Sequence, residues 1–119
     1  MKTLRTFVPA KDYATARRFY KELGFEERFS SNEITIIACG PESFLLQNAY
    51  QKIWADNFMM QLMVVDLDAW WEKLEALDLA ARYEGVKVKA PEDYPWGLRE
   101  IHLIDPSGVL WHITQLPVG

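Results

Sequence analysis

The sequence predicts an α+β fold made of two β-α-β-β-β modules, whose strands form a curved mixed sheet around a half-barrel cleft with the helices outside. Three observations predict it. The chain of 119 residues repeats itself at about half its length, each half contains an amphipathic helix after a short extended segment, and each half ends in strand-like runs. We therefore expect a single domain over residues 1–119 that contains two repeats, about 1–50 and 56–119.

The repeat is visible when the chain is aligned with itself at an offset of 54 residues. Phe25–Phe29, with the sequence FEERF, then matches Leu79–Tyr83, with the sequence LAARY. The same offset pairs positions of the two predicted helices and their caps, namely Asp12 with Asp66, Ala16 with Trp70, Tyr20 with Leu74 and Leu23 with Leu77. Similarity at a fixed offset indicates two copies of one structural unit.

The first half is expected to begin with an extended segment over Thr3–Val8. It leads to Asp12, whose carboxylate can cap a helix by accepting a backbone N–H bond. The helix has an apolar stripe of period 3.6, formed by Ala16, Phe19, Tyr20 and Leu23. Gly24 can adopt the left-handed conformation that ends this helix. Three strand-like runs follow, at Phe25–Ser30, Ile34–Cys39 and Phe44–Gln47.

The second half repeats this order after a joint at residues 48–57. Met59–Val65 is expected to be extended, and Asp66 to cap a second helix. The stripe of that helix consists of Leu67, Trp70, Trp71, Leu74 and Leu77. The remaining predicted elements are a strand near Arg82–Val88, a loop over Lys89–Gly97, and a hairpin of Arg99–Ile104 with Val109–Gln115 closed by the turn Asp105-Pro106-Ser107-Gly108.

Composition and charge exclude several function classes. The net charge is −4 and the basic residues are scattered, so the chain offers little to a phosphate backbone and we expect no nucleic-acid partner. No apolar run approaches the roughly 20 residues of a membrane span, so we expect neither a membrane partner nor export. Cys39 is the single cysteine, which agrees with a reducing, cytoplasmic location.

Two segments carry a resemblance to a known family. The run Phe19–Phe25, FYKELGF, resembles the helix-end signature of the vicinal oxygen chelate superfamily, which groups glyoxalases, extradiol dioxygenases and bleomycin resistance proteins. Pro95–Glu100, with the sequence PWGLRE, together with Asp105–Gly108 is similar to the bleomycin-resistance branch. The resemblance covers nearly the whole chain and implies a homodimer whose clefts are completed by the partner. A duplicated ferredoxin-like fold with both faces filled is the alternative.

The resemblance also permits a test for a metal site. Metal-using members carry ligands at four positions, which fall here on Thr3, Phe44, Met59 and His112, with Leu46 in place of Phe44 if the register slips by two. Only His112 offers a suitable donor for a divalent transition metal. We therefore predict no metal, no cofactor and no catalytic residue.

One cluster keeps an altered metal or acid/base site open. His102 and His112 fall on the two strands of one predicted hairpin, and Glu100 shares strand parity with His102 because Ile101 and Leu103 read as core positions. The other interpretation is that these three side chains bind a ligand or stabilise the hairpin by hydrogen bonds.

Strand parity and the two irregular segments predict the residues of a ligand site. Trp54 and Trp96 lie in those segments and could stack on a ligand or be buried in a dimer. The predicted ligand-binding residues are Arg5, Phe44, Leu46, Trp54, Met59, Gln61, Trp96, Glu100, His102 and His112. The sequence thus predicts a metal-independent protein that sequesters a small aromatic or cationic molecule. The alternatives are a glyoxalase-like lyase or dioxygenase with an altered metal site, and a structural dimer with a collapsed cleft.

Overall fold

The fold consists of eight strands and four helices in a computed structural model that describes residues 3–117. The elements in chain order are β1 (Phe7–Pro9), α1 (Tyr13–Glu22), β2 (Glu26–Ser30), β3 (Ile34–Cys39), β4 (Glu42–Gln47), α2 (Lys52–Asp56), β5 (Met59–Val64), α3 (Leu67–Leu77), α4 (Leu79–Arg82), β6 (Lys87–Asp93), β7 (Arg99–Ile104) and β8 (Leu110–Gln115).

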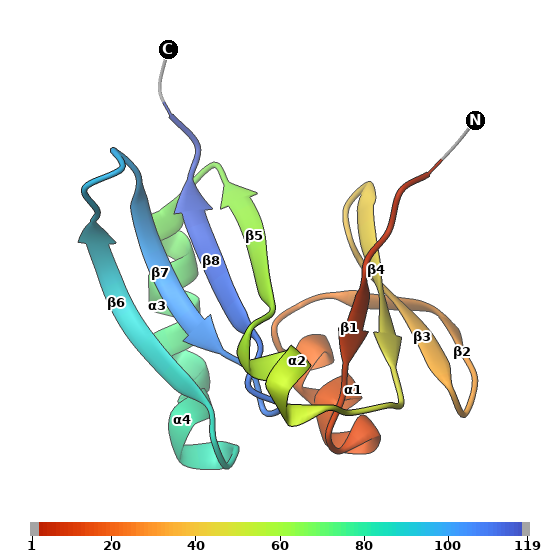
Figure 1. The fold of residues 1–119 in the computed structure, drawn as a ribbon. Helices are drawn as coiled ribbons and strands as arrows, with labels where there is room; N and C mark the ends of the chain where they lie inside the picture. The colour runs from red at the N-terminus through yellow and green to blue at the C-terminus, as the bar shows by residue number, and fades with distance from the viewer. Residues whose placement is uncertain (1–2, 118–119) are drawn as a thin grey trace.

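The strands form two mixed sheets of the same topology, with strand orders β1-β4-β3-β2 and β5-β8-β7-β6 (Figure 1). In each sheet the first strand of the module pairs in parallel with the last strand, and the other pairs are antiparallel. The predicted α+β fold of two β-α-β-β-β modules is confirmed. The strands form two open four-stranded sheets, and within residues 3–117 no strand pair joins one sheet to the other.

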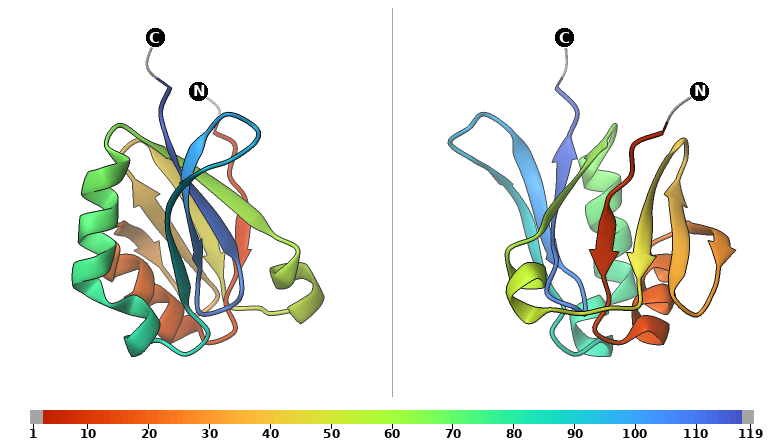
Figure 2. Two further views of the ribbon diagram at one scale, coloured as in Figure 1. Left: turned by 90° about the vertical axis from the view of Figure 1, so that its left-hand side faces the viewer. Right: turned by 45° about the vertical axis from the view of Figure 1, so that its right-hand side comes forward.

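The helices α1 and α3 cover the same side of the molecule, whereas the short helix α2 lies on the opposite side, at one end of the sheets (Figures 1 and 2). Both α1 and α3 begin at the predicted caps, because the Asp12 carboxylate accepts the Thr15 N–H and the Asp66 carboxylate accepts the Ala69 N–H. The sheet faces turned away from α1 and α3 are called the concave faces below.

An aromatic cluster joins the two modules on the helix side. Tyr20 from α1, Phe44 from β4 and Trp111 from β8 pack with ring centroids 5.2 to 5.7 Å apart, and Phe25 stacks on Tyr20. These rings belong to the buried core. Because the cluster takes rings from both modules, neither half can bury its own apolar face completely.

Four predicted segment boundaries need correction. The strand β1 covers only Phe7–Pro9, and the joint between the modules contains the short helix α2. The strand expected near Arg82–Val88 begins at Lys87 instead, because Leu79–Arg82 forms the helix α4. The segment expected as a loop from Lys89 continues as strand to Asp93. A register shift between Lys89 and Glu92 on this edge strand accommodates Pro91, which has no N–H to donate.

None of the helices within residues 3–117 has both the length and the apolar composition needed to cross a membrane.

Candidate functional site

A buried carboxylate between two imidazoles forms the centre of the candidate site. Glu100 is 2 % exposed, and its Oε1 lies 3.0 Å from His102 Nε2 and 3.0 Å from His112 Nδ1. The Thr114 hydroxyl donates to Oε2 of the same carboxylate at 3.0 Å. Every oxygen of this buried carboxylate therefore has a hydrogen-bond partner, as a buried charge requires.

The register of the β7–β8 hairpin brings these side chains together. His102 lies directly opposite His112, and Glu100 lies opposite Thr114. The alternate positions Ile101 and Leu103 are fully buried on the helix side. Side chains alternate along a strand, so the remaining positions point to the concave face of the second sheet. The predicted parity of Glu100 and His102 is confirmed.

Two opposing effects act on the ionisation of Glu100. Burial raises the pKa of a carboxyl group, but the hydrogen bonds from His112, His102 and Thr114 together outweigh burial and hold the pKa of Glu100 below its ordinary value. Glu100 is therefore an anion at neutral pH, held on one hairpin by three side-chain donors.

A stack of three rings extends from the carboxylate to the surface. Tyr94 stacks on His102 with ring centroids 4.6 Å apart, and Trp96 stacks on Tyr94 at 4.7 Å. The Tyr94 hydroxyl lies 3.3 Å from His102 Nδ1. Trp96 remains 57 % exposed, so it can still provide apolar ring surface to a ligand.

These groups border a hollow of about 320 Å³ on the concave face, called the concave hollow below. Its lining is Met59, Met60, Gln61, Trp96, Leu98, Glu100 and His112. Five of these residues are predicted site residues, and His102 contacts two of them. The volume falls at the lower end of the range for small-molecule sites.

A second, apolar groove lies between the modules. It measures about 340 Å³ and includes Phe25, Phe44 and Trp111, together with side chains of β5. Met60 and Gln61 line both this groove and the concave hollow, so the strand β5 borders both spaces. Phe44 is part of the aromatic core and lines this groove together with Gln61 and Met63 of β5.

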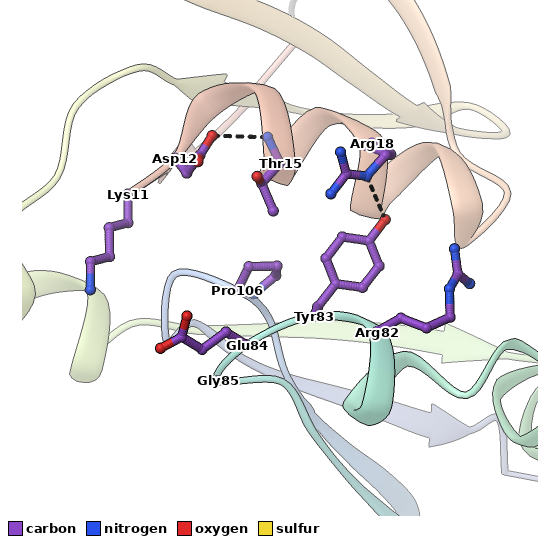
Figure 3. Close-up of a pocket in the computed structure, with 9 residues that line it drawn as sticks. All are labelled: Lys11, Asp12, Thr15, Arg18, Arg82, Tyr83, Glu84, Gly85 and Pro106. Atoms are coloured by element: carbon purple, nitrogen blue, oxygen red, sulfur yellow. Dashed lines mark hydrogen bonds between the residues drawn. The ribbon is translucent and has the colours of Figure 1, made fainter.

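A larger hollow of about 620 Å³ lies between the start of α1 and the turn after α4 (Figure 3). Its lining is Lys11, Asp12, Thr15, Arg18, Arg82, Tyr83, Glu84, Gly85 and Pro106. Two of its three cationic groups form hydrogen bonds, because Arg18 donates to the Tyr83 hydroxyl and Arg82 to Glu22. No predicted site residue lines this hollow. Its mostly polar lining does not favour it as the site of an aromatic ligand.

The structure corrects part of the predicted site. Phe44 and Leu46 were expected to point into the cleft, but both face the helices, and Leu46 is completely buried. The β1–β4 register explains the error, because Val8 lies opposite Leu46 on the buried side while Phe7 and Leu45 share the concave face. Arg5 is half-buried, and it lines none of the three hollows described; neither does Trp54, which is 71 % exposed on α2.

The four superfamily metal positions do not fit a metal ion. Phe44 is part of the aromatic core, Thr3 carries a hydroxyl on an exposed residue, and Met59 offers only a thioether. His112 alone suits a divalent transition metal, and one ligand does not hold such an ion.

Three residues of the site are absent from the sequence prediction, namely Met60, Tyr94 and Leu98. Tyr94 was assigned to a loop, and Leu98 was read only as part of a motif. Strand alternation could not have indicated that Tyr94 and Trp96 stack, because they lie in a turn in which the Gly97 N–H donates to the Tyr94 carbonyl.

Solved structures with this fold cover almost the whole chain. A bleomycin-binding protein complexed with bleomycin has a TM-score of 0.84 and 23% identity, over 98% of this chain and 100% of that one. The bleomycin-binding protein from Streptomyces verticillus, complexed with copper(II)-bleomycin, has a TM-score of 0.76 and 24% identity, over 98% and 99%. TnmS3, an antibiotic-binding protein from Streptomyces sp. CB03234, has a TM-score of 0.76 and 21% identity, over 98% of both chains. At these identities the likeness shows the fold.

No curated protein matches the sequence. The model of the family described as Glyoxalase/Bleomycin resistance protein/Dioxygenase superfamily matches residues 2–113, which is nearly the full length of the chain. The resemblance stated from the sequence is confirmed, and the chain belongs to the glyoxalase/bleomycin resistance protein/dioxygenase superfamily.

Proposed function

We propose that this protein binds a small aromatic or cationic molecule in the concave hollow and sequesters it without changing it chemically. The observation that carries the proposal is the hollow of about 320 Å³, which combines apolar walls at Met59, Trp96 and Leu98 with the polar pair Glu100 and His112. A preformed apolar space with a few convergent polar groups is the usual form of a small-molecule site. Bleomycin-binding and antibiotic-binding proteins with the same fold support this role.

The proposed ligand chemistry follows from the ring stack and the charge. Trp96 can extend the stack of Tyr94 and His102 to a planar ligand, and an aromatic face also attracts a cation. The net charge of −4 favours a cationic ligand. We propose that binding needs no metal ion, because the superfamily positions supply one suitable donor. A homodimer in the cytoplasm is the proposed form.

Tryptophan fluorescence of the chelator-treated protein tests this proposal. The protein is titrated with a panel of planar and cationic antibiotics that includes bleomycin. A saturable change in emission is expected, and Trp96→Ala is expected to weaken the affinity about fivefold, since a stacked aromatic pair contributes on the order of 1 kcal/mol. Trp54→Ala is the matched control, because Trp54 is exposed and does not line the hollow. Equal loss in both variants, or no saturable ligand, contradicts the proposal.

A metal-dependent lyase or dioxygenase with an altered site is the second candidate. The observation that favours it is Glu100 held between His102 and His112. It predicts turnover only after a divalent metal is added, and loss of turnover in His112→Ala, measured on glyoxalase and ring-cleavage substrates. Absence of turnover with added metal removes this candidate.

A further inference from the structure

We propose that Glu100, His102 and His112 form a binding site for a divalent first-row transition metal ion at the edge of the concave hollow. The site shares only His112 with the four superfamily positions, and it replaces the others with two residues of β7. It could hold a metal ion whether or not the proposed small-molecule binding is correct.

The first argument is the donor set. One carboxylate and two imidazoles on one face of a hairpin are the ligands that Zn²⁺ and Fe²⁺ prefer when some coordination positions stay open. The ligand atoms of Glu100, His102 and His112 all lie within 4.8 Å of one another. These are also the only two histidines of the 119-residue chain, and the fold places them opposite each other on adjacent strands.

The second argument is the spacing. Metal–ligand bonds of about 2.0–2.2 Å place the ligand atoms of a tetrahedral ion about 3.3 Å apart. Glu100 Oε1 lies 3.0 Å from each of the two imidazole nitrogens. Each oxygen–nitrogen pair therefore needs to separate by only about a few tenths of an ångström, and a metal ion also needs the two imidazole nitrogens, which lie within 4.8 Å of each other, to take about the same spacing.

The third argument is the surrounding hydrogen bonds, which orient each ligand. The Tyr94 hydroxyl contacts His102 Nδ1, so His102 Nε2 is directed toward Glu100. His112 Nε2 contacts the Met59 thioether, so its Nδ1 faces the same carboxylate. The Thr114 hydroxyl holds the second oxygen of Glu100. Metal-bound histidines and carboxylates usually have such outer partners, which fix their orientation.

The fourth argument is access. Both imidazoles are about one-fifth exposed, and Glu100 and His112 line the concave hollow. An ion held by the three side chains would have its remaining coordination positions toward that hollow. Water or an oxygen or nitrogen atom of a bound molecule could occupy them.

Calorimetric titration of the untagged, chelator-treated full chain with Zn²⁺ tests the proposal, with Co²⁺ absorption as a second readout. We expect one ion per chain with a dissociation constant of about 1 µM or lower, and a higher melting temperature with the metal. His102→Ala and His112→Ala should each weaken binding at least about a hundredfold, because removal of a ligand exceeds the 10–100-fold effect of an outer partner.

Two matched controls separate this site from adventitious binding. Cys39→Ser removes the free thiol, and Glu33→Gln removes an exposed carboxylate on a turn of the first module; both should bind Zn²⁺ as the unmodified protein does. Circular dichroism checks the fold of each variant, and the two histidine variants keep the test decisive if Glu100→Gln does not fold. Binding weaker than about 100 µM, or binding that survives in the double histidine variant, overturns the proposal. None of these measurements uses the small-molecule ligand, so they are independent of the proposed function.

Discussion

The hydroxyl of Tyr20 donates a hydrogen bond to Asp105 Oδ2 across the boundary between the two modules. Tyr20 belongs to α1, whereas Asp105 begins the turn between β7 and β8, and both are buried. The same hydroxyl accepts the Trp111 indole N–H at 2.9 Å. Asp105 also accepts the N–H groups of Ser107 and Val109, so one carboxylate organises the turn of the site hairpin and attaches it to the first module.

We expect Tyr20→Phe to lower the free energy of unfolding by about 1–3 kcal/mol, because it leaves Asp105 and the Trp111 N–H buried without this partner. Denaturant titration followed by circular dichroism measures the change. Tyr50→Phe, on a half-buried tyrosine of the joint between the modules, is the control and should change the free energy by less than about 0.5 kcal/mol. Equal changes in the free energy of unfolding in Tyr20→Phe and Tyr50→Phe would show that the hydrogen bonds of the Tyr20 hydroxyl do not stabilise the fold.

An ion pair between α1 and β2 predicts a pH dependence. Arg17 Nε and Nη2 donate to the two oxygens of Glu27 at 2.8 and 2.9 Å. The hydrogen bonds from Arg17 hold the pKa of Glu27 below its ordinary value of 4.5, although burial opposes them. A carboxyl group with a lowered pKa in the folded state stabilises the fold above its unfolded pKa. That contribution is lost as the pH falls through the folded pKa.

We therefore expect the stability to fall below about pH 4.5 and Glu27→Gln to flatten part of that decline. Urea unfolding at a series of pH values measures it. Glu33→Gln, on an exposed turn, is the control and should follow the unmodified protein. A Glu27→Gln curve parallel to that of the unmodified protein contradicts the prediction.

The concave faces predict a homodimer. Phe7 is 50 % exposed, and Met59 and Met63 are also exposed on the edge strand β5. Apolar side chains gathered on one face indicate an interaction surface. We expect light scattering to give twice the chain mass of 13.9 kDa. Phe7→Asp should shift the protein toward a monomer, whereas Val65→Asp, on an exposed turn residue, should not. A monomer in the unmodified protein refutes the prediction.

The turn of the site hairpin depends on Gly108. Its φ is +96°, and a Cβ there would lie 2.9 Å from Asp56 Oδ1. We expect Gly108→Ala to destabilise the fold by about 1–3 kcal/mol, measured by thermal unfolding. Gly40→Ala is the matched control, because its φ of +59° lies in the ordinary left-handed region and a Cβ would meet nothing within 4 Å. Equal losses would show that the turn tolerates a side chain.

The sequence by itself determined the modules and the helix caps, and it placed Glu100 and the two histidines on one predicted hairpin. These features depend on local patterns, namely a period of 3.6 in helices, alternation in strands, and the turn Asp105–Gly108 that sets the register of one hairpin. His102 and His112 therefore come together through the geometry of one hairpin, because β7 and β8 are joined by a short turn.

Only the tertiary structure decided which face of β4 is buried and what surrounds the carboxylate. Both faces of β4 carry apolar residues, so parity alone could not choose between Phe44 and Leu45; packing against Tyr20 and Trp111 made the choice. The ring stack depends on where the chain after β6 returns to the sheet. That path is determined by the bulge in the edge strand β6 and by the contact of Tyr94 with His102. The periodicity of apolar residues encodes neither of them.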